Sequence, residues 1–352
     1  MSNGGSISTP STPAMSPAMA SAPRERGWRL LVAALVVALF VPLVAALRAI
    51  VPIEQTILLI APAMAGCALV GWMMGGRFWL ALIWAALAAW VISAPGAIGG
   101  GFLSLSRGWA LVLSASFALV GALSPNRPFF PRALSAVAMS FLVSLALIIG
   151  TRVVPSTLSQ SVEQEFNRRL DASSAQWQRT AGSNDWHDFA VKYPAVATVV
   201  EEGERQLRAI PPMTATLFPA LLAMESLAIL GLAWSLYHRA TRSRIGAPMR
   251  ALSEFRFSDQ LVWGLVVGVT MLVIPTLQEA HGLGLNLVVF FGALYALRGL
   301  GVLDWFLAPR GFVRALFIIA IFLAWPVVGV FSLGLGLGDT WIDWRGRARP
   351  TT

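Results

Sequence analysis

Long apolar runs recur along this chain, and each is close to the length that a helix needs to cross a lipid bilayer. A helix crosses about 30 Å of hydrocarbon with roughly 17–25 apolar residues. Unpaired backbone groups are costly in lipid, so such runs form helices or closed barrels, and unbroken runs exclude the alternation of barrel strands. Charged residues make up 12% of the chain and apolar residues 57%, whereas about a quarter of a soluble domain is charged. The sequence therefore predicts an all-α, polytopic transmembrane helix bundle.

About nine segments fit this length, five before a charged region and four after it. The first five are Trp28–Leu47, Ile57–Met74, Phe78–Ile92, Leu105–Leu123 and Ala133–Val153. The last four are Pro212–Tyr237, Leu261–Thr276, Leu283–Phe306 and Val313–Leu337. We expect a disordered N-terminal tail at 1–25, an N-terminal transmembrane bundle at 26–153, an extramembrane helical insertion at 154–210, a C-terminal transmembrane bundle at 211–337 and a polar, basic tail at 338–352.

The insertion differs from the spans because its apolar residues alternate with charges. Leu158, Val162, Phe166 and Leu170 recur every fourth residue with glutamates and arginines between them, which indicates a surface helix. Two shorter helical stretches follow, and Pro211 and Pro212 suit the first turn of the next span. The insertion is therefore predicted to be a small helical domain outside the bilayer.

The distribution of arginine predicts the orientation of the bundle. Cytoplasmic loops carry an excess of Lys and Arg, which places the N-terminus and the basic loop at 238–259 in the cytoplasm and the insertion outside. Nine spans then place the C-terminal tail outside as well. That tail carries Arg345, Arg347 and Arg349, so this part of the topology conflicts with the rule.

Two ionisable residues fall within predicted spans, where a charge costs about 2.5 kcal/mol or more. Glu225 lies near the centre of the sixth span, and Arg298 lies in the eighth, which also contains Asn286. One hypothesis pairs Glu225 and Arg298, with Asn286, around a polar cavity that binds a small solute. A second makes Glu225 a carrier of protons or ions. A third is a salt bridge between helices that fixes their packing.

Motifs for other chemistry are absent from the sequence. His187, His238 and His281 lie in different loops, so no metal-ligand spacing exists. No nucleotide-binding or catalytic motif is present, and Cys67 has no second cysteine with which to pair. The net charge of +9 is scattered between apolar runs instead of clustered on one face. We therefore expect no enzyme activity, no metal, no cofactor and no nucleic-acid partner.

Small residues recur at a spacing of four in three spans, as Ala34 and Ala38, Gly71 and Gly75, and Gly264 and Gly268. Such pairs let helix backbones approach closely. Most pairs of this kind are internal packing contacts, and a surface for another membrane subunit is the alternative.

The segment from Gly284 to Asp304, with its Ala293-Leu-Tyr-Ala-Leu-Arg-Gly-Leu-Gly301, resembles the YybS-like family of bacterial membrane proteins, a domain of unknown function (DUF2232). The stretch from Leu335 to Arg345 is similar to that family's closing motif. The resemblance implies a location in the bacterial inner membrane. The family is distantly similar to the substrate-binding S-components of energy-coupling-factor transporters, and Ala34 and Ala38 resemble the motif by which those components dock.

Two functions follow as hypotheses. The chain is a solute-binding or transport component with Glu225, Arg298 and Asn286 at the site, or a non-transporting scaffold whose external domain recruits an envelope protein. Both place the chain in contact with the lipid bilayer, and the first adds a small-molecule solute.

Overall fold

The computed structural model describes residues 53–94, 101–125, 127–151, 155–198, 211–241, 245–307 and 325–347, together with Trp28 and Glu202. Every regular element within these ranges is helical, and the described chain contains no strand. The prediction of an all-α bundle is therefore confirmed.

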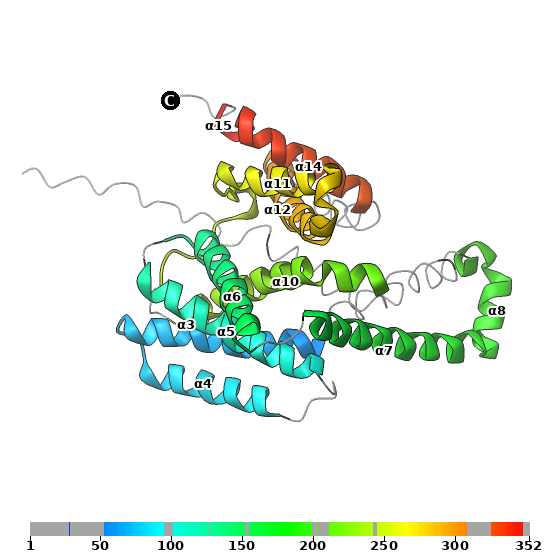
Figure 1. Ribbon diagram of the computed structural model, residues 1–352, viewed down its shortest axis with the longest axis horizontal. Coiled ribbons are helices and arrows are strands. Elements are labelled where there is room, and N and C mark those ends of the chain that lie inside the picture. The colour runs from blue at the N-terminus through cyan, green and yellow to red at the C-terminus, as the bar shows by residue number, and fades with distance from the viewer. Residues whose placement is uncertain are drawn as a thin grey trace, which may run out of the picture.

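Five helices form an N-terminal group: α3 (Ile53–Met73), α4 (Phe78–Ser93), α5 (Gly101–Leu123), α6 (Phe129–Thr151) and α10 (Pro211–Ala240). They lie together in the lower part of Figure 1, with α3 in contact with α4, α5 and α10. Their shared core is apolar and includes Leu59, Leu113, Phe117, Leu230 and Trp234, all fully buried. Small side chains line α3 at this core, which lets its neighbours pack closely.

A C-terminal group consists of α11 (Val262–Val273), α12 (His281–Leu307), α14 (Trp325–Ile342) and the short α15 (Trp344–Arg347). Three 3-10 turns accompany them: η2 (Leu252–Glu254), η3 (Asp259–Leu261) and η4 (Pro275–Ala280). Helix α12 packs against both α11 and α14. A Cβ atom at Gly299 would overlap the carbonyl of Ser332, so this glycine lets α12 and α14 touch backbone to backbone.

The glycine pairs behave as packing contacts where the structure describes them. Gly264 lies against Phe291, and a Cβ at Gly268 would be 3.0 Å from the carbonyl oxygen of Gly284, so this pair joins α11 to α12. Gly71 lies against the hydroxyl of Tyr237, whereas Gly75 has φ +86° in an open turn. The interpretation of Gly264 and Gly268 as internal contacts is therefore confirmed, while Ala34 and Ala38 lie outside the described residues.

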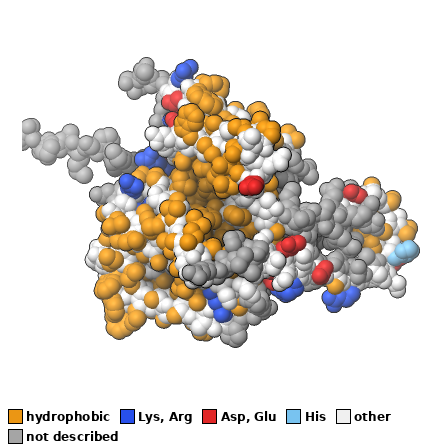
Figure 2. All heavy atoms as spheres, in the orientation of Figure 1, with side chains coloured by type: hydrophobic (Ala, Val, Ile, Leu, Met, Phe, Trp, Pro, Cys, Tyr) orange, Lys and Arg blue, Asp and Glu red, His pale blue; other side chains and the backbone are white. Residues whose placement is uncertain are grey.

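Four helical stretches in the described chain are long and apolar enough to cross a membrane: Gly101–Leu123, Phe129–Thr151, Ala215–Ala240 and Pro275–Leu307. Four shorter apolar helices accompany them: Leu58–Met73, Phe78–Ser93, Asp259–Val273 and Val327–Ile342. Apolar side chains cover most of the bundle face seen in Figure 2, while charged ones gather toward its ends and beyond. The chain is thus a multi-pass membrane protein in contact with lipid.

Trp28, the loop at 245–259 and α15 meet at one end of the bundle, which we call the basic end. The indole of Trp28 donates to the carbonyl of Arg250 (2.8 Å), and Arg345 donates to the carbonyls of Ser253 (2.8 Å) and Phe255 (3.2 Å). Trp28 and Arg345 therefore lie at the same end of the described helices.

The structure places α15 against the basic loop, which is the arrangement that the positive-inside rule favours for Arg345 and Arg347. The count of about nine spans and the side of the C-terminal tail stay predictions. Of the predicted ninth segment, Val313–Leu337, the part from Trp325 onward lies within the described residues. It belongs to α14, which continues to Ile342.

The insertion forms a projecting arm, residues 155–198, whose helices are α7 (Pro155–Ala181) and α8 (Asn184–Lys192). Figure 1 shows both extending away from the bundle, at the end opposite to α15. Ser183 caps α8 by accepting from the backbone N–H of Trp186 (3.3 Å). Val162 and Phe166 of the predicted apolar stripe are buried against Phe102 and the half-buried Phe218. Leu158 is half-buried, and the side chain of Leu170 lies outside the described part.

Candidate functional site

The three predicted site residues lie on α10 and α12 but do not form one site. Glu225 is half-buried in α10, with one carboxylate oxygen fully enclosed. Arg298 and Asn286 are both buried in α12, on its C-terminal and N-terminal halves respectively. The predicted pairing of Glu225 with Arg298 is wrong, because the guanidinium of Arg298 binds two aspartates that come from other elements.

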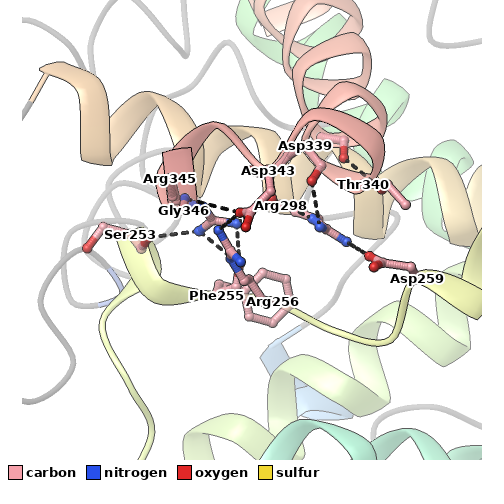
Figure 3. A network of polar contacts seen from close by, with 11 residues as sticks. Ser253, Phe255, Arg256, Asp259, Arg298, Asp339, Thr340, Asp343, Arg345 and Gly346 are labelled. Carbon is pink, nitrogen blue, oxygen red and sulfur yellow. Dashed lines mark hydrogen bonds and ion pairs between the residues drawn. The ribbon is translucent and has the colours of Figure 1, made fainter. Parts of the chain in front are cut away.

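Arg298 is bound through all three of its nitrogens. Its Nε donates to Oδ2 of Asp339 (2.9 Å), its Nη2 to the carbonyl oxygen of Asp339 (3.1 Å), and its Nη1 to Oδ1 of Asp259 (2.8 Å). The guanidinium also lies 5.4 Å from the centre of the Phe257 ring. Figure 3 shows Arg298 between Asp339 and Asp259, so it links α12 to α14 and to η3.

A second arginine binds the same carboxylate. Nη2 of Arg345 donates to Oδ2 of Asp339 (2.6 Å), while its guanidinium also reaches the carbonyls of Ser253 and Phe255. Asp339 and both arginines are almost completely buried. We call Asp259, Arg298, Asp339 and Arg345 the charge cluster. It ties α12, α14, α15 and the loop before α11 together at the basic end.

An exposed ion pair stands beside the charge cluster. Arg256 donates to Asp343, whose backbone adopts the left-handed φ of 46° between α14 and α15. The hydrogen bond from Arg256 lowers the pKa of Asp343, which lies outside the spanning segments. This pair faces solvent, so it contributes far less than the buried contacts of Asp339.

The geometry of the charge cluster suits a structural clamp. Each of the three nitrogens of Arg298 already donates a hydrogen bond to Asp339 or Asp259. Breaking a buried ion pair by removing one partner costs about 3–5 kcal/mol, because the remaining charge stays buried. The solute-binding role of Arg298 stays a prediction.

Asn286 is occupied in a similar way. Its Oδ1 accepts from the backbone N–H of Ala220 (2.8 Å), and its Nδ2 donates to the carbonyls of Thr216 (2.7 Å) and Gly282 (2.7 Å). Ala220 and Thr216 both belong to α10, so Asn286 joins the two helix groups. Its predicted role at a solute site also stays a prediction.

Arg132 is a buried cation in the first turn of α6. Its nitrogens donate to the carbonyls of Ile245 (2.7 Å), Ser124 (3.0 Å), Pro125 (2.8 Å) and Arg127 (3.0 Å). Its guanidinium lies 4.8 Å from the centre of the Trp234 ring. Its place one turn after Pro128, at the start of α6, was the only sequence signal that it binds the turn before it.

Metal-ligating side chains do not gather within the described residues: no group of three His, Cys, Asp or Glu is placed to hold an ion there. The ring of His238 instead contacts the carbonyls of Trp234 (2.9 Å) and Gly246 (3.2 Å). Cys67 is fully buried in the core of the N-terminal group.

The tip of the arm is the other candidate site. Phe189, Val191, Tyr193 and Val196 are all exposed, and Val191 is exposed by 71%. The rings of Trp186, Phe189 and Tyr193 form a row, with centroids 5.4 Å and 5.3 Å apart. We call the four exposed side chains the tip patch. The described residues leave it uncovered at the far end of the arm.

The base of the arm is anchored by a buried acidic residue. Glu165 accepts from Arg168 (2.9 and 2.7 Å) and Arg169 (2.8 Å), and the Arg169 guanidinium lies 4.9 Å from the centre of the Phe102 ring. Burial alone would raise the pKa of Glu165, but the hydrogen bonds from the two arginines outweigh it and lower the pKa. The arm is therefore fixed to α5 at its base and exposed at its tip.

Comparison with known proteins gives a family but no characterised relative. No curated protein and no solved structure matches the chain. The model of a family described as predicted membrane protein (DUF2232) matches residues 38–340. This range includes Asn286, Arg298 and Asp339. Since the match covers most of the sequence, the chain belongs to the DUF2232 family of predicted membrane proteins.

Proposed function

We propose that this protein is a non-catalytic scaffold of the bacterial inner membrane whose arm holds an envelope protein outside the cytoplasm. The observation that carries the proposal is the tip patch, which presents four apolar side chains to solvent at the end of a helical arm. Contiguous exposed apolar side chains on a soluble surface mark protein contacts. The partner is a protein with a complementary apolar surface.

The proposed orientation rests on the arginines of the turns. Three of these arginines lie between helices (Arg77, Arg127 and Arg250), and two lie in the last turns of α10 and α15 (Arg239 and Arg347). The arm, by contrast, contains five acidic and four basic residues. Since positive charge is retained in the cytoplasm, the basic end and the N-terminus are proposed to be cytoplasmic, and the arm external.

Photo-crosslinking in the native host tests the docking role. A photoreactive residue at Val191 or at Val196 is expected to capture the same protein, and the adduct should disappear when Phe189→Ser is added. Val273, exposed at the arm end of α11, is the matched control and should not give this adduct. Equal capture from Val273, no adduct from the tip, or an adduct of two copies of this chain would each overturn the proposal.

A second candidate, a solute-binding component resembling an S-component, is favoured by Glu225 alone. This residue places an enclosed carboxylate oxygen within a spanning helix, and ionisable groups at such positions are commonly functional. Glu225→Gln keeps the shape of the side chain and removes its charge. Under this candidate the substitution abolishes retention of a bound small molecule, and unchanged retention would exclude Glu225 from the site.

A further inference from the structure

Helix α10 contains a proline, which leaves one hydrogen bond of the regular helical ladder unformed at a point that we call the break. Pro219 lies within α10 and has no backbone N–H to donate to the carbonyl of Ala215. A proline ring also pushes away the carbonyl four residues earlier, which bends the helix and weakens the next hydrogen bond of the ladder. That next bond would join the N–H of Ala220 to the carbonyl of Thr216.

The amide of Asn286 binds both groups of this pair. It accepts from Ala220 at 2.8 Å and donates to Thr216 at 2.7 Å, so a side chain of α12 binds both backbone groups that this hydrogen bond of α10 would join. Its remaining N–H donates to Gly282, one turn earlier in α12, which fixes the orientation of the amide. Such backbone groups are costly to leave unpaired inside a membrane protein, so the amide stabilises the break.

The break lies between the arm and the bundle. Before Pro219, the half-buried Ala215 and Phe218 pack against Val162 and Phe166 at the arm base. After it, Leu222 and Ala223 belong to the core of the N-terminal group. The first turns of α10, together with Phe102 of α5, therefore hold the base of the arm.

We infer that Pro219 and Asn286 form a locked hinge, in which the amide of Asn286 holds the break in α10 open and fixes the orientation of the arm relative to α12. Asn286 is thus a positioning residue that joins the two helix groups to the arm. The inference goes beyond the docking role and holds whether or not the tip patch binds a partner.

The locked hinge predicts how substitutions at Asn286 and Pro219, alone and combined, change the orientation of the arm. Asn286→Leu keeps the approximate size of the side chain but removes the donor and the acceptor, so α10 either bends freely or closes the Thr216–Ala220 bond. Pro219→Ala supplies the missing N–H and lets α10 form a regular ladder without help from α12. Combining the two changes should therefore give a single arm orientation again.

Distances between two spin labels in lipid vesicles test the inference. In a Cys67→Ala background, labels replace Val191 at the arm tip and Leu283 at the start of α12, both exposed. The parent protein is expected to give one narrow distance distribution. Asn286→Leu should broaden or shift it by several ångströms, and Pro219→Ala with Asn286→Leu should give a narrow distribution again. Tyr295→Phe, which removes a buried hydroxyl from α12 and leaves Asn286 and Pro219 in place, should leave the distances unchanged.

Two results would overturn the hinge. One is an unchanged distribution in Asn286→Leu, and the other is a double variant as broad as Asn286→Leu alone. If Asn286→Leu alone does not fold, the double variant still decides, because it must then recover a monodisperse protein with one arm distance. Partner capture from Val191 is measured separately, so failure of the hinge and failure of the docking role are distinguishable.

Discussion

In α3, α5, α6 and α10 most buried side chains are apolar, whereas α12 and α14 meet around buried ions of both signs. The core of the N-terminal group gathers Leu, Phe, Ala and Met side chains, and its buried polar contacts include the hydrogen bond from Trp109 to Ser226 (2.9 Å) and those of Arg132 with backbone carbonyls at one end. The C-terminal group has a much smaller apolar cluster and places the charge cluster beside it. Both groups face the same lipid, so their internal chemistry is what differs.

The difference shows what positions one helix against another in lipid, where burying apolar surface between helices gains no free energy. Lipid tails are as apolar as leucine, so helices associate through close packing and hydrogen bonds. In the N-terminal group the helices are held by van der Waals packing, because many medium-sized apolar side chains interlock. The C-terminal group uses glycine contacts together with Asp339 and its two arginines, which accept only one register of α14 against α12.

The largest effect is expected from the charge cluster. Arg298→Leu leaves Asp339 buried with one partner fewer and should lower the free energy of unfolding by about 3–5 kcal/mol. Reversible unfolding by detergent in mixed micelles measures this change. Asp343→Asn, which removes only the exposed pair with Arg256, is the matched control and should have no measurable effect. Equal effects of the two substitutions would show that the buried cluster holds nothing together.

A substitution that leaves a cavity in the N-terminal group should lower the free energy of unfolding somewhat less than Arg298→Leu does. Leu113→Ala removes a fully buried side chain and should lower the free energy of unfolding by roughly 2–4 kcal/mol, depending on how far the core collapses. The loss should be insensitive to salt and pH because no charge is involved. The same unfolding assay measures it, and Leu111→Ala, at an exposed position of the same helix, should change little.

The glycine contact between α12 and α14 should be sensitive to a single methyl group. Gly299→Ala places a Cβ against the carbonyl of Ser332 and should cost roughly 1–3 kcal/mol through overpacking. Gly334→Ala, where a Cβ meets open space, should be neutral or slightly stabilising. If both variants unfold alike, the close approach of the two helices does not hold in the membrane.

The smallest effect concerns the arm base and depends on pH. The pKa of Glu165 is lowered in the folded protein, so its contribution to stability is present above its ordinary pKa of about 4.3 and is lost as pH falls through the folded value. The protection of α7 amides against hydrogen exchange, relative to their intrinsic rates at each pH, should therefore fall in acid. Glu165→Gln should remove this dependence, whereas Glu163→Gln, at an exposed position, should retain it.

Apolar length and turn residues were enough to predict the helices of the N-terminal group, but not the contacts of buried polar residues. Arg298 was recognised as costly in lipid, yet its partner Asp339 was assigned to the polar tail because a charge usually ends an apolar segment. Asn286 was expected to face a solute, since sequence alone cannot show that Pro219, distant along the chain, exposes backbone groups beside it. In both cases the partner lies on another helix, and the hydropathy pattern of a sequence does not show which helices pack against each other.

Native mass spectrometry of protein purified gently from its own host tests the docking role most directly. The proposed function predicts a co-purifying protein in stoichiometric amount that is lost in Val191→Asp, which places a charge in the tip patch, and retained in Glu225→Gln. The contradicting result is a stoichiometric small molecule that is lost in Glu225→Gln and unaffected by Val191→Asp, with no protein partner. That outcome would assign the protein to solute binding and leave the arm without a docking role.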